Sequence, residues 1–296
     1  MPELPDVEAF RAVLASCAEH AVIRQVDVYD TGVLRGGLSE RRLRRELPGL
    51  SFGTPERHGK WLLARTEGDD GPGPTVLLHF GMTGRLVCCA PGEPLHAHDR
   101  VVVTVQPGDR GGGPRKRGGG PRERQSGTRG RGGAPDEREL RYRDQRKLKG
   151  LWLLDEDGVK RMLADQGPDA AAVGRAEFDA LLAGRRGGLK ATLTDQSVLA
   201  GLGNLLADEI LWRARLAPGT RAGALSDAER KRLYTQLRRT LEATVRAGCV
   251  PDRASWLTGH RTEDPAHCPR CGGPLRRDRA GGRATVWCPR CQPPGT

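Results

Sequence analysis

The apolar positions near the start of the chain recur every three or four residues. Val7, Phe10, Leu14 and Cys17 follow this spacing, which places them on one face of an amphipathic helix. Asp6 stands where an acidic residue caps the first turn of such a helix. The pattern therefore predicts a helix directly behind the first few residues, where most chains have a solvated tail.

Residues 21–106 carry short runs of β-branched and apolar residues that are broken by glycine and proline. These runs are "VIRQVDVYD", "KWLLART", "TVLLHFGMTGRLVCC" and "RVVVTVQ". Such runs are typical of strands, so the region predicts a mostly antiparallel sandwich or barrel. Strand character returns at "ELRYRD" and "GLWLL".

A segment of glycine, arginine and other polar residues, about residues 107–139, interrupts the strands. It has almost no apolar residues, so it cannot bury enough surface to offset the entropy of ordering. We expect a disordered insertion. Its arginines can add sequence-independent attraction to phosphates, or the insertion can be a tolerated loop expansion without a role.

The pattern becomes helical from about residue 160. The run "EFDALLA" ends at Gly184, a suitable residue to follow a helix. In "TDQSVLAGLGNLLADEILWRA", Gly201 and Gly203 indicate two helices joined by a tight turn. Ser226 and Glu229 form a capping box. The helix behind this box has four apolar residues on one face: Leu233, Leu237, Leu241 and Val245.

Two "CPRC" motifs near the end of the chain predict a structural zinc site. They place four thiols in two CxxC pairs that enclose sixteen residues: Cys268, Cys271, Cys288 and Cys291. Four soft thiolates at this spacing suit one tetrahedral Zn²⁺. The chain shows no secretion signal, which disfavours disulfides here. The scattered cysteines, Cys17, Cys88, Cys89 and Cys249, are expected to be small buried hydrophobic residues without a function.

The residues between the cysteine pairs predict a β-hairpin with a Gly-Gly turn. Zinc supplies the folding free energy that so small a core lacks, about 10–16 kcal/mol in comparable peptides. The hairpin is basic, with Arg276, Arg277, Arg279 and Arg283 in or beside it. This character suits a phosphate groove, and it suits a protein-binding ribbon equally well.

Composition narrows the range of partners. The net charge of +12 and the pI near 9.8 favour polyanions, because each neutralised phosphate releases counterions. No apolar run is long enough for a membrane span, and the start lacks the pattern of a signal peptide. The default expectation is a cytoplasmic protein that does not contact membranes.

The first residues offer a candidate nucleophile. Removal of Met1 before a small residue would expose the amine of Pro2. An α-amino group titrates at about 7.7–8.0, so part of it is neutral at physiological pH. A secondary amine forms a permanently charged iminium with an aldehyde carbon, and such nucleophiles need a proton-transfer partner. Glu3 is adjacent in sequence and can act as that acid or base.

Together the motifs resemble the formamidopyrimidine-DNA glycosylase/endonuclease VIII family of base-excision repair enzymes. The resemblance rests on "MPELPDVE", "HGKWLL", "LHFGMTGRL", "DQSVLAGLGNLLADEI" and "GGRATVWCPRCQ", which occur in the family's order. It implies an α+β multidomain fold of three parts. The first part is the catalytic domain (1–158), an N-terminal antiparallel β-sandwich with a leading helix. A helix–two-turns–helix domain (159–258) and a zinc-finger hairpin (259–296) follow it.

The resemblance also implies a mechanism. Pro2 would attack C1′ of the damaged nucleotide, expel the base and hold the sugar as an iminium, and β,δ-elimination would cut the strand. Glu3 matches the acid that protonates the sugar oxygen. The partner would be damaged double-stranded DNA, bound by a monomer with one structural zinc. The start "MPELP" lacks a glycine at the third mature position, and this resembles the formamidopyrimidine branch of the family. The expected substrates are therefore oxidised purines such as 8-oxoguanine and formamidopyrimidines. Oxidised pyrimidines are the second choice.

The family's DNA-contacting positions map onto eight residues of this chain. Phosphate contacts are implied for Lys60, His79, Asn204 and Arg283, and a place near the damaged nucleotide for Lys190. Met82 matches the side chain that fills the gap left by a flipped base, and Arg146 matches the arginine that contacts the orphaned base. Taken singly, each is an ordinary surface or strand residue. Their full set is Lys60, His79, Met82, Arg146, Leu148, Lys190, Asn204 and Arg283.

Three features depart from the family's pattern. The usual "DPRRFG" appears as "DQRKLK", so Leu148 replaces a wedge phenylalanine. Asp6 replaces a glutamate, and the stretch after "RARLAP" does not reproduce the loop that caps oxidised purines. Two other classes of function remain open from the residues alone: a nucleic-acid binder without catalysis, and a zinc-ribbon module for protein interactions.

Overall fold

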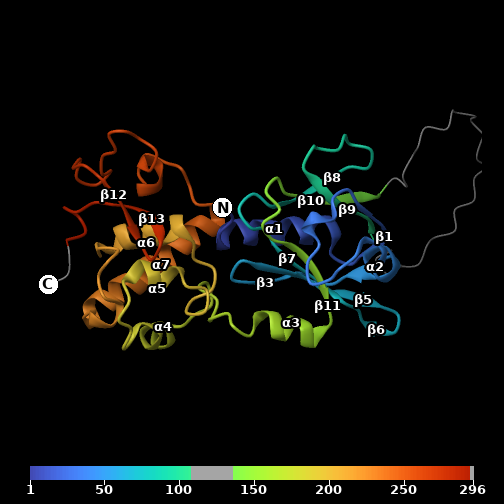
Figure 1. Cartoon of the computed structure of the whole chain (residues 1–296), viewed down its shortest axis with the longest axis horizontal. Helices are drawn as coiled ribbons and strands as arrows, with labels where there is room; N and C mark the ends of the chain where they lie inside the picture. Colours follow the sequence, from blue (N-terminus) through green and yellow to red (C-terminus); the bar gives the residue numbers. More distant parts are fainter. Residues whose placement is uncertain (108–135, 294–296) are drawn as a thin grey trace, which may run out of the picture.

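The computed structural model describes residues 1–107 and 136–293. A β-rich N-terminal half and a helical C-terminal half lie side by side, and a small zinc-finger module packs on the helical half (Figure 1). The N-terminus lies at the centre of the view, where the two halves meet. The N-terminal sandwich, the helical domain and the hairpin expected from the sequence are all present.

The N-terminal half consists of two antiparallel sheets with helices packed beside them. Its helical elements are α1 (Leu4–Ala18), the 3-10 turn η1 (Thr31–Val33) and α2 (Glu40–Glu46). Its strands are β1 (Ala21–Val28), β2 (Ser51–Phe52), β3 (Glu56–His58), β4 (Trp61–Ala64), β5 (Thr66–Gly68), β6 (Gly71–Pro72), β7 (Thr75–His79), β8 (Arg85–Cys89), β9 (Asp99–Pro107), β10 (Arg138–Arg143) and β11 (Gly150–Leu154). One sheet has the order β6-β5-β2-β1-β9-β10-β8 and the other the order β11-β7-β4-β3.

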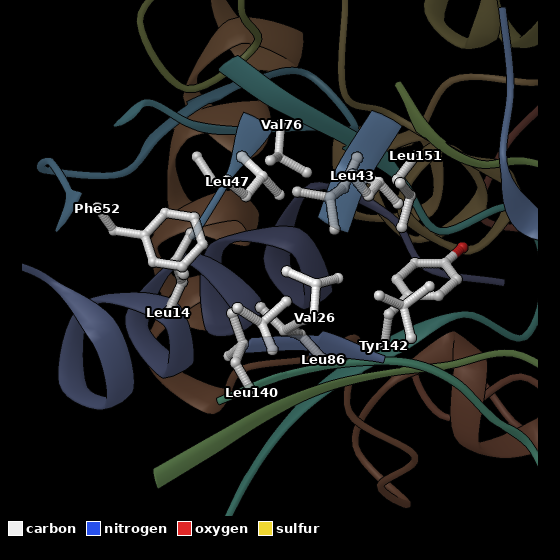
Figure 2. A pocket seen from close by; sticks show the side chains of 14 residues that line it. Leu14, Val26, Leu43, Leu47, Phe52, Val76, Leu86, Leu140, Tyr142 and Leu151 are labelled. Carbon is white, nitrogen blue, oxygen red and sulfur yellow. The ribbon is translucent and has the colours of Figure 1, made fainter. Parts of the chain in front are cut away.

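The inner faces of the two sheets share one apolar core with α1 and α2. Figure 2 shows how side chains from these elements converge, including Leu14 of α1, Val26 of β1 and Val76 of β7. The space left between them is about 30 Å³, roughly the volume of one water molecule. This hollow is therefore a gap in the packing of the core and has no room for a ligand.

The C-terminal half is mainly helical. Its elements are α4 (Arg175–Leu182), α5 (Leu189–Thr194), α6 (Asn204–Ala214), η2 (Ala222–Ala224), α7 (Asp227–Ala247) and η3 (Leu257–His260). Helix α3 (Glu156–Leu163) precedes them in the chain and packs against β7 and β11 of the N-terminal half. Ser226 and Glu229 form the predicted capping box of α7, and Gly184 follows α4 in the left-handed conformation. None of the helices within residues 1–107 and 136–293 has the length and apolar character needed to cross a bilayer.

The zinc-finger module is a two-stranded hairpin with the predicted Gly-Gly turn. Strand β12 (Arg276–Ala280) pairs with β13 (Arg283–Trp287), so that Ala280 lies opposite Arg283. Gly281 and Gly282 both have positive φ, as a tight two-residue hairpin turn requires. The module packs its own small core against Trp212 of α6.

Helix α1 connects the two halves. Its Val7, Leu14 and Cys17 are buried in the core of the sandwich, as the spacing predicts, whereas Leu4 belongs to the core of the helical domain. At the same junction, Arg57 of β3 forms an ion pair with Asp169, which precedes α4. The first turn of α1 is therefore held by both halves.

The structure corrects three details of the sequence analysis. Strand β9 ends at Pro107 and β10 begins at Arg138, so residues 138–139 belong to the sheet, where Arg138 pairs with Val105. The rest of the predicted disordered insertion, residues 108–135, lies outside the described residues. The run "TVLLHFGMTGRLVCC" is two strands, because its central glycines form a loop. Helix α3 begins at Glu156, before the expected start of the helical region.

The remaining corrections concern side-chain environments. Val245 is 36% exposed. Each step of four residues turns about 40° beyond a full helical turn, so a ladder of three steps leaves the buried face. Cys17 and Cys88 form a disulfide, and Cys249 is exposed. The expectation of small buried residues was therefore right for Cys17 and Cys89, whereas Cys88 and Cys249 are exposed. Strand β8 lies against α1 and brings Cys88 to Cys17.

Candidate active site

The first residues of the chain line a pocket of about 420 Å³, whose lining comes entirely from the N-terminal half. Leu4 anchors this segment, because its side chain is fully buried and its backbone N–H donates to the carbonyl oxygen of Gly201 at 3.1 Å. Asp6 accepts a hydrogen bond from the backbone N–H of Glu3 at 2.8 Å. The terminus is thus fixed rather than frayed, with Pro2 facing the pocket.

The carboxylate of Glu3 is buried at the N-terminus of α6. It accepts three backbone N–H bonds, from Gly203 at 2.9 Å, Leu205 at 2.8 Å and Leu206 at 3.1 Å. Burial raises the pKa of Glu3 above its usual value, and these amides together with Lys60 oppose the rise. A carboxyl group in this balance can both give and take a proton.

Lys60 lies at the turn between β3 and β4, close to the same carboxylate. It is 9% exposed, and burial lowers its pKa to about 8, with Arg283 lowering it and Glu3 raising it. The turn is positioned by Asp169, which accepts the backbone N–H of Gly59 at 2.7 Å. An ammonium group with this pKa is charged only part of the time at physiological pH.

His79 at the end of β7 is held in one tautomer. Its Nδ1 accepts the backbone N–H of Gly81 at 3.0 Å, so the proton of the neutral ring resides on Nε2. Burial, with the nearby charges of Lys149 and Lys60, lowers its pKa to about 4. His79 is therefore neutral at pH 7 and offers a hydrogen-bond donor rather than a positive charge.

Asn204 is the first residue of α6 and follows the "GLG" turn. Its Oδ1 is buried and has no hydrogen-bond partner among residues 1–107 and 136–293. The N-terminus of a helix attracts anions through its free N–H groups and its dipole. Glu3 occupies part of that site from inside the protein, and Asn204 lies beside it.

Two loops bring the predicted base-contacting residues together. Arg146 donates from Nη1 to the sulfur of Met82 at 3.2 Å, and its backbone N–H donates to Thr83 at 3.0 Å. Met82 is 40% exposed and Leu148 is 50% exposed. The two loops therefore present two apolar side chains and one guanidinium beside the pocket, which Met82 also lines.

Lys190 is placed differently from the other predicted residues. Its side chain is fully buried, forms an ion pair with Asp208 of α6 at 2.7 Å and donates to the carbonyl oxygen of Ala284 at 2.7 Å. Burial lowers its pKa, while Asp208 opposes this shift. Lys190 thus holds the backbone next to Arg283, and a direct contact with a nucleotide stays a prediction.

Arg283 itself is exposed at the start of β13. Its positive charge lowers the pKa of both Lys60 and Lys190, so the hairpin tip reaches the region of both lysines. The turn before it packs on α5, where a Cβ at Gly281 would come 2.7 Å from that of Ala191. The packing fixes where the exposed guanidinium stands.

The four cysteines of the "CPRC" motifs fit one zinc ion. Their sulfur atoms all lie within 4.8 Å of one another. The Sγ atoms of Cys268 and Cys291 are 3.8 Å apart, and those of Cys271 and Cys288 are 3.6 Å apart. Zn–S bonds of about 2.3 Å in a tetrahedron require S···S edges of about 3.8 Å. The donor set and its spacing therefore match a single structural Zn²⁺.

Family models cover almost the whole chain. The N-terminal domain of formamidopyrimidine-DNA glycosylase matches residues 1–151, its H2TH domain matches residues 165–253, and the zinc finger found in FPG and IleRS matches residues 268–294. The chain belongs to the formamidopyrimidine-DNA glycosylase family.

Relatives of similar length support this membership in the formamidopyrimidine-DNA glycosylase family. The formamidopyrimidine-DNA glycosylase of Thermomicrobium roseum is 35% identical over 99% of each chain. That of Symbiobacterium thermophilum is 33% identical over 99% of this chain and 90% of its own. Among solved structures, Lactococcus lactis Fpg in complex with DNA containing an abasic site has a TM-score of 0.77. It is 23% identical over 99% of this chain and 100% of its own, which shows the shared fold.

The structure adds pocket residues that the sequence analysis missed. His96, His98 and Arg143 line the pocket with Pro2. Arg143 is oriented by Asp99, which accepts from its Nε at 2.6 Å. The "HAHD" stretch was the available signal, since two histidines flank one residue just before a strand. Only the packing of β8, β9 and β10 in one sheet shows that this stretch meets the N-terminus.

Asp208 was also missed, although it lies within a quoted motif. It joins Lys190 to the hairpin by accepting from Thr285 Oγ1 at 2.7 Å and from the backbone N–H of Val286 at 3.1 Å, and it pairs with Arg261. In the sequence it resembles an ordinary helical acid. Its role becomes visible only when the hairpin is docked on α6.

Proposed function

We propose that the protein is a bifunctional DNA glycosylase and AP lyase that excises oxidised bases from duplex DNA in base excision repair. The proposal rests chiefly on one observation: a fixed Pro2 lines a pocket, and the next residue is a buried carboxyl group held by the N-terminus of α6. Membership of the family supports the same chemistry.

The first step is base removal by Pro2. After loss of Met1, the neutral amine of Pro2 attacks C1′ of the damaged nucleotide. The C1′–N bond to the base breaks, and the base departs with a proton. The sugar ring then opens at O4′, and the nitrogen lone pair forms a C1′=N iminium.

Glu3 is the proton carrier of these steps. Its protonated form, which burial favours, supplies the proton that O4′ needs as the ring opens. The resulting carboxylate is stabilised by the three amides of α6. It can then accept the proton lost from C2′ when β-elimination breaks the C3′–O bond, and δ-elimination releases the 5′ phosphate before water hydrolyses the iminium.

Four residues are proposed to hold the phosphates around the lesion. Lys60 and Arg283 supply positive charge, His79 supplies a neutral N–H donor, and Asn204 supplies its amide beside the α6 N-terminus. His79 and Asn204 supply hydrogen-bonding groups without adding charge to the site. Lys190 acts from behind, through the backbone at Ala284.

The gap left by the flipped base is assigned to Met82, Arg146 and Leu148. Met82 and Leu148 are exposed apolar side chains on neighbouring loops, and Arg146 donates to the Met82 sulfur. Leucine has less stacking surface than phenylalanine, so we expect weaker wedging at this position.

The name carried by the relatives, formamidopyrimidine-DNA glycosylase, favours oxidised purines as the substrate, with oxidised pyrimidines second. We place the enzyme in the cytoplasm, where it acts as a monomer with one structural zinc. The zinc holds the base of the hairpin, and its chemistry is structural because four thiolates fill its coordination.

Borohydride trapping tests the proposal. The processed protein is incubated with duplexes containing 8-oxoguanine, an oxidised pyrimidine or an abasic site, and the iminium is reduced to a stable protein–DNA adduct. A variant that retains Met1 is expected to bind the same duplexes without forming the adduct. Binding without any adduct or strand cleavage from the processed protein would instead establish a damaged-DNA binder.

A further inference from the structure

A second basic site lies at the opposite end of α6 from Asn204. It is a pocket of about 620 Å³ next to the zinc-binding cysteines, and we call it the four-arginine pocket. The residues that line it are Arg215, Arg232, Arg270, Cys271, Arg290, Cys291 and Pro293. No acidic residue of the described chain is among them, so the lining has one sign of charge.

Two of the arginines are fixed by the C-terminus of α6. Arg232 donates from Nε to the carbonyl oxygen of Ala214 at 2.6 Å, and Arg270 donates from Nη1 to that of Trp212 at 3.0 Å. The Arg270 guanidinium also stacks on the Trp212 ring at 4.2 Å from its centroid. Each guanidinium has five N–H groups, so donors remain for a ligand.

The other two arginines have no internal partner. Within residues 1–107 and 136–293, the side chains of Arg215 and Arg290 form no hydrogen bond and no ion pair, and both residues are exposed. A loaded zinc site with four thiolates carries a net charge of about −2. The four guanidinium groups exceed this by about two positive charges, so neutralising the metal site does not account for them.

The pocket is separate from the proposed DNA site. Helix α6 (Asn204–Ala214) has 11 residues and is about 16 Å long. The DNA-contacting Asn204 is at its start and the pocket is at its end. The hairpin gives the same order, since Arg283 is at the tip and the pocket is at the cysteine base. In Figure 1 the C-terminal segment (red) lies at the left, far from the N-terminus at the centre.

We propose that the four-arginine pocket binds an acidic peptide segment of a partner protein while DNA occupies the cleft. Clusters of arginine recognise carboxylate-rich motifs through charge-assisted, often bidentate hydrogen bonds. The pocket is concave, and Pro293 adds an apolar side chain beside its guanidinium groups, whereas Cys271 and Cys291 are the zinc-binding thiolates. Such a mixed lining suits acidic residues interspersed with apolar ones better than it suits a bare phosphate backbone.

Fluorescence anisotropy with the zinc-loaded full chain tests this proposal. The probe is a labelled dodecapeptide of Asp, Glu and Phe, and the control peptide carries Asn and Gln in place of the acids. The acidic peptide is expected to bind equally well in the presence and absence of a saturating abasic-site duplex. Equal affinity for the two peptides, or displacement of the acidic peptide by the duplex, would overturn the proposal.

The variant Arg215→Glu/Arg290→Glu is expected to bind the acidic peptide at least tenfold more weakly, with unchanged borohydride trapping. Arg239→Glu, an exposed arginine of α7 outside the pocket, is the matched control and should bind normally. Zinc content and thermal unfolding show whether the variants fold. If the substitution at Arg290 causes loss of zinc, the single variant Arg215→Glu, which lies outside the cysteine module, still tests the proposal. Unchanged peptide binding, or an equal loss of duplex affinity that reveals a DNA contact, would refute the assignment.

Discussion

The chemistry of the site is set by three side chains whose environment changes their protonation. Glu3 is buried and its pKa is raised, Lys60 is buried and its pKa is lowered to about 8, and the pKa of His79 is lowered to about 4. Desolvation is the largest cause in each case, because burial disfavours whichever form is charged. A cationic protein thus keeps a neutral donor, and a lysine that loses its charge near pH 8, beside Pro2 and Glu3.

The affinity for lesion-containing duplex should fall as the pH rises through about 8. Lys60 has its free-state pKa near that value. Below it the ammonium is already charged, and above it binding to phosphate requires uptake of one proton, which costs up to about tenfold in affinity per pH unit. Anisotropy titrations between pH 6.5 and 9.5 measure this dependence. The ionic strength is held constant, because salt screens charge interactions with the DNA.

The variant Lys60→Arg is the control for that dependence, since a guanidinium stays charged over the whole range. Its affinity curve should be flat around pH 8. The same inflection in Lys60→Arg would assign the titration to another group, such as the amine of Pro2. His79 should add no inflection between pH 5 and 7, because it is neutral throughout that range.

At the scale of elements, the N-terminus of α6 positions the carboxyl group of Glu3, the proposed proton carrier. The "GLGN" turn supplies backbone amides to Glu3. Position 203 needs a glycine because the Glu3 carboxyl group lies against its backbone, and not because of its φ, which is −117°. A Cβ at Gly203 would lie 2.3 Å from the carboxyl carbon of Glu3. The turn and the first residues of the chain are therefore matched in shape as well as in hydrogen bonding.

Gly203→Ala should reduce base excision about 100-fold while leaving the fold intact. The new methyl group displaces the Glu3 carboxylate, and a shift of about 1 Å at a reacting group has a cost of this order. Single-turnover excision of 8-oxoguanine measures the effect, and circular dichroism checks the fold. Gly219→Ala, where a Cβ meets no atom within 4 Å, should retain full activity, and equal activity of the two variants would contradict this account.

At the scale of the whole molecule, Asp208 docks the zinc hairpin on the helical domain. It is fully buried and contacts Lys190 of α5, Thr285 of β13 and Arg261 after η3. Through these contacts the packing of α6 determines where the hairpin tip, with Arg283, stands relative to Lys60. One buried carboxylate thus connects the metal module to the reacting centre.

Asp208→Asn should destabilise the protein by about 3–5 kcal/mol, because it leaves the buried ammonium of Lys190 without a counter-charge. Denaturant unfolding measures the change. Lys190→Met in the Asp208→Asn background should recover part of the loss, since it removes the unpaired charge. A double variant less stable than Asp208→Asn alone would contradict the assignment of that cost to Lys190.

Much of the fold follows from local patterns in the sequence. The helix behind the terminus, the strand runs, the capping box at Ser226, the Gly-Gly turn and the CxxC pairs were all predicted and are present. These features depend on hydrophobic periodicity, turn chemistry and ligand spacing within a few residues. Such features can be predicted from the sequence because the groups that interact are close to one another along the chain.

The sequence by itself therefore determined the elements, the zinc ligands and, through the ordered motifs, the family. The tertiary structure alone decided that Glu3 is held by amides about 200 residues away, that Lys190 is buried against Asp208, and that Cys17 meets Cys88. It also gathered four arginines from four segments into one pocket. Burial and charge pairing depend on which distant surfaces meet, and no local pattern encodes that meeting.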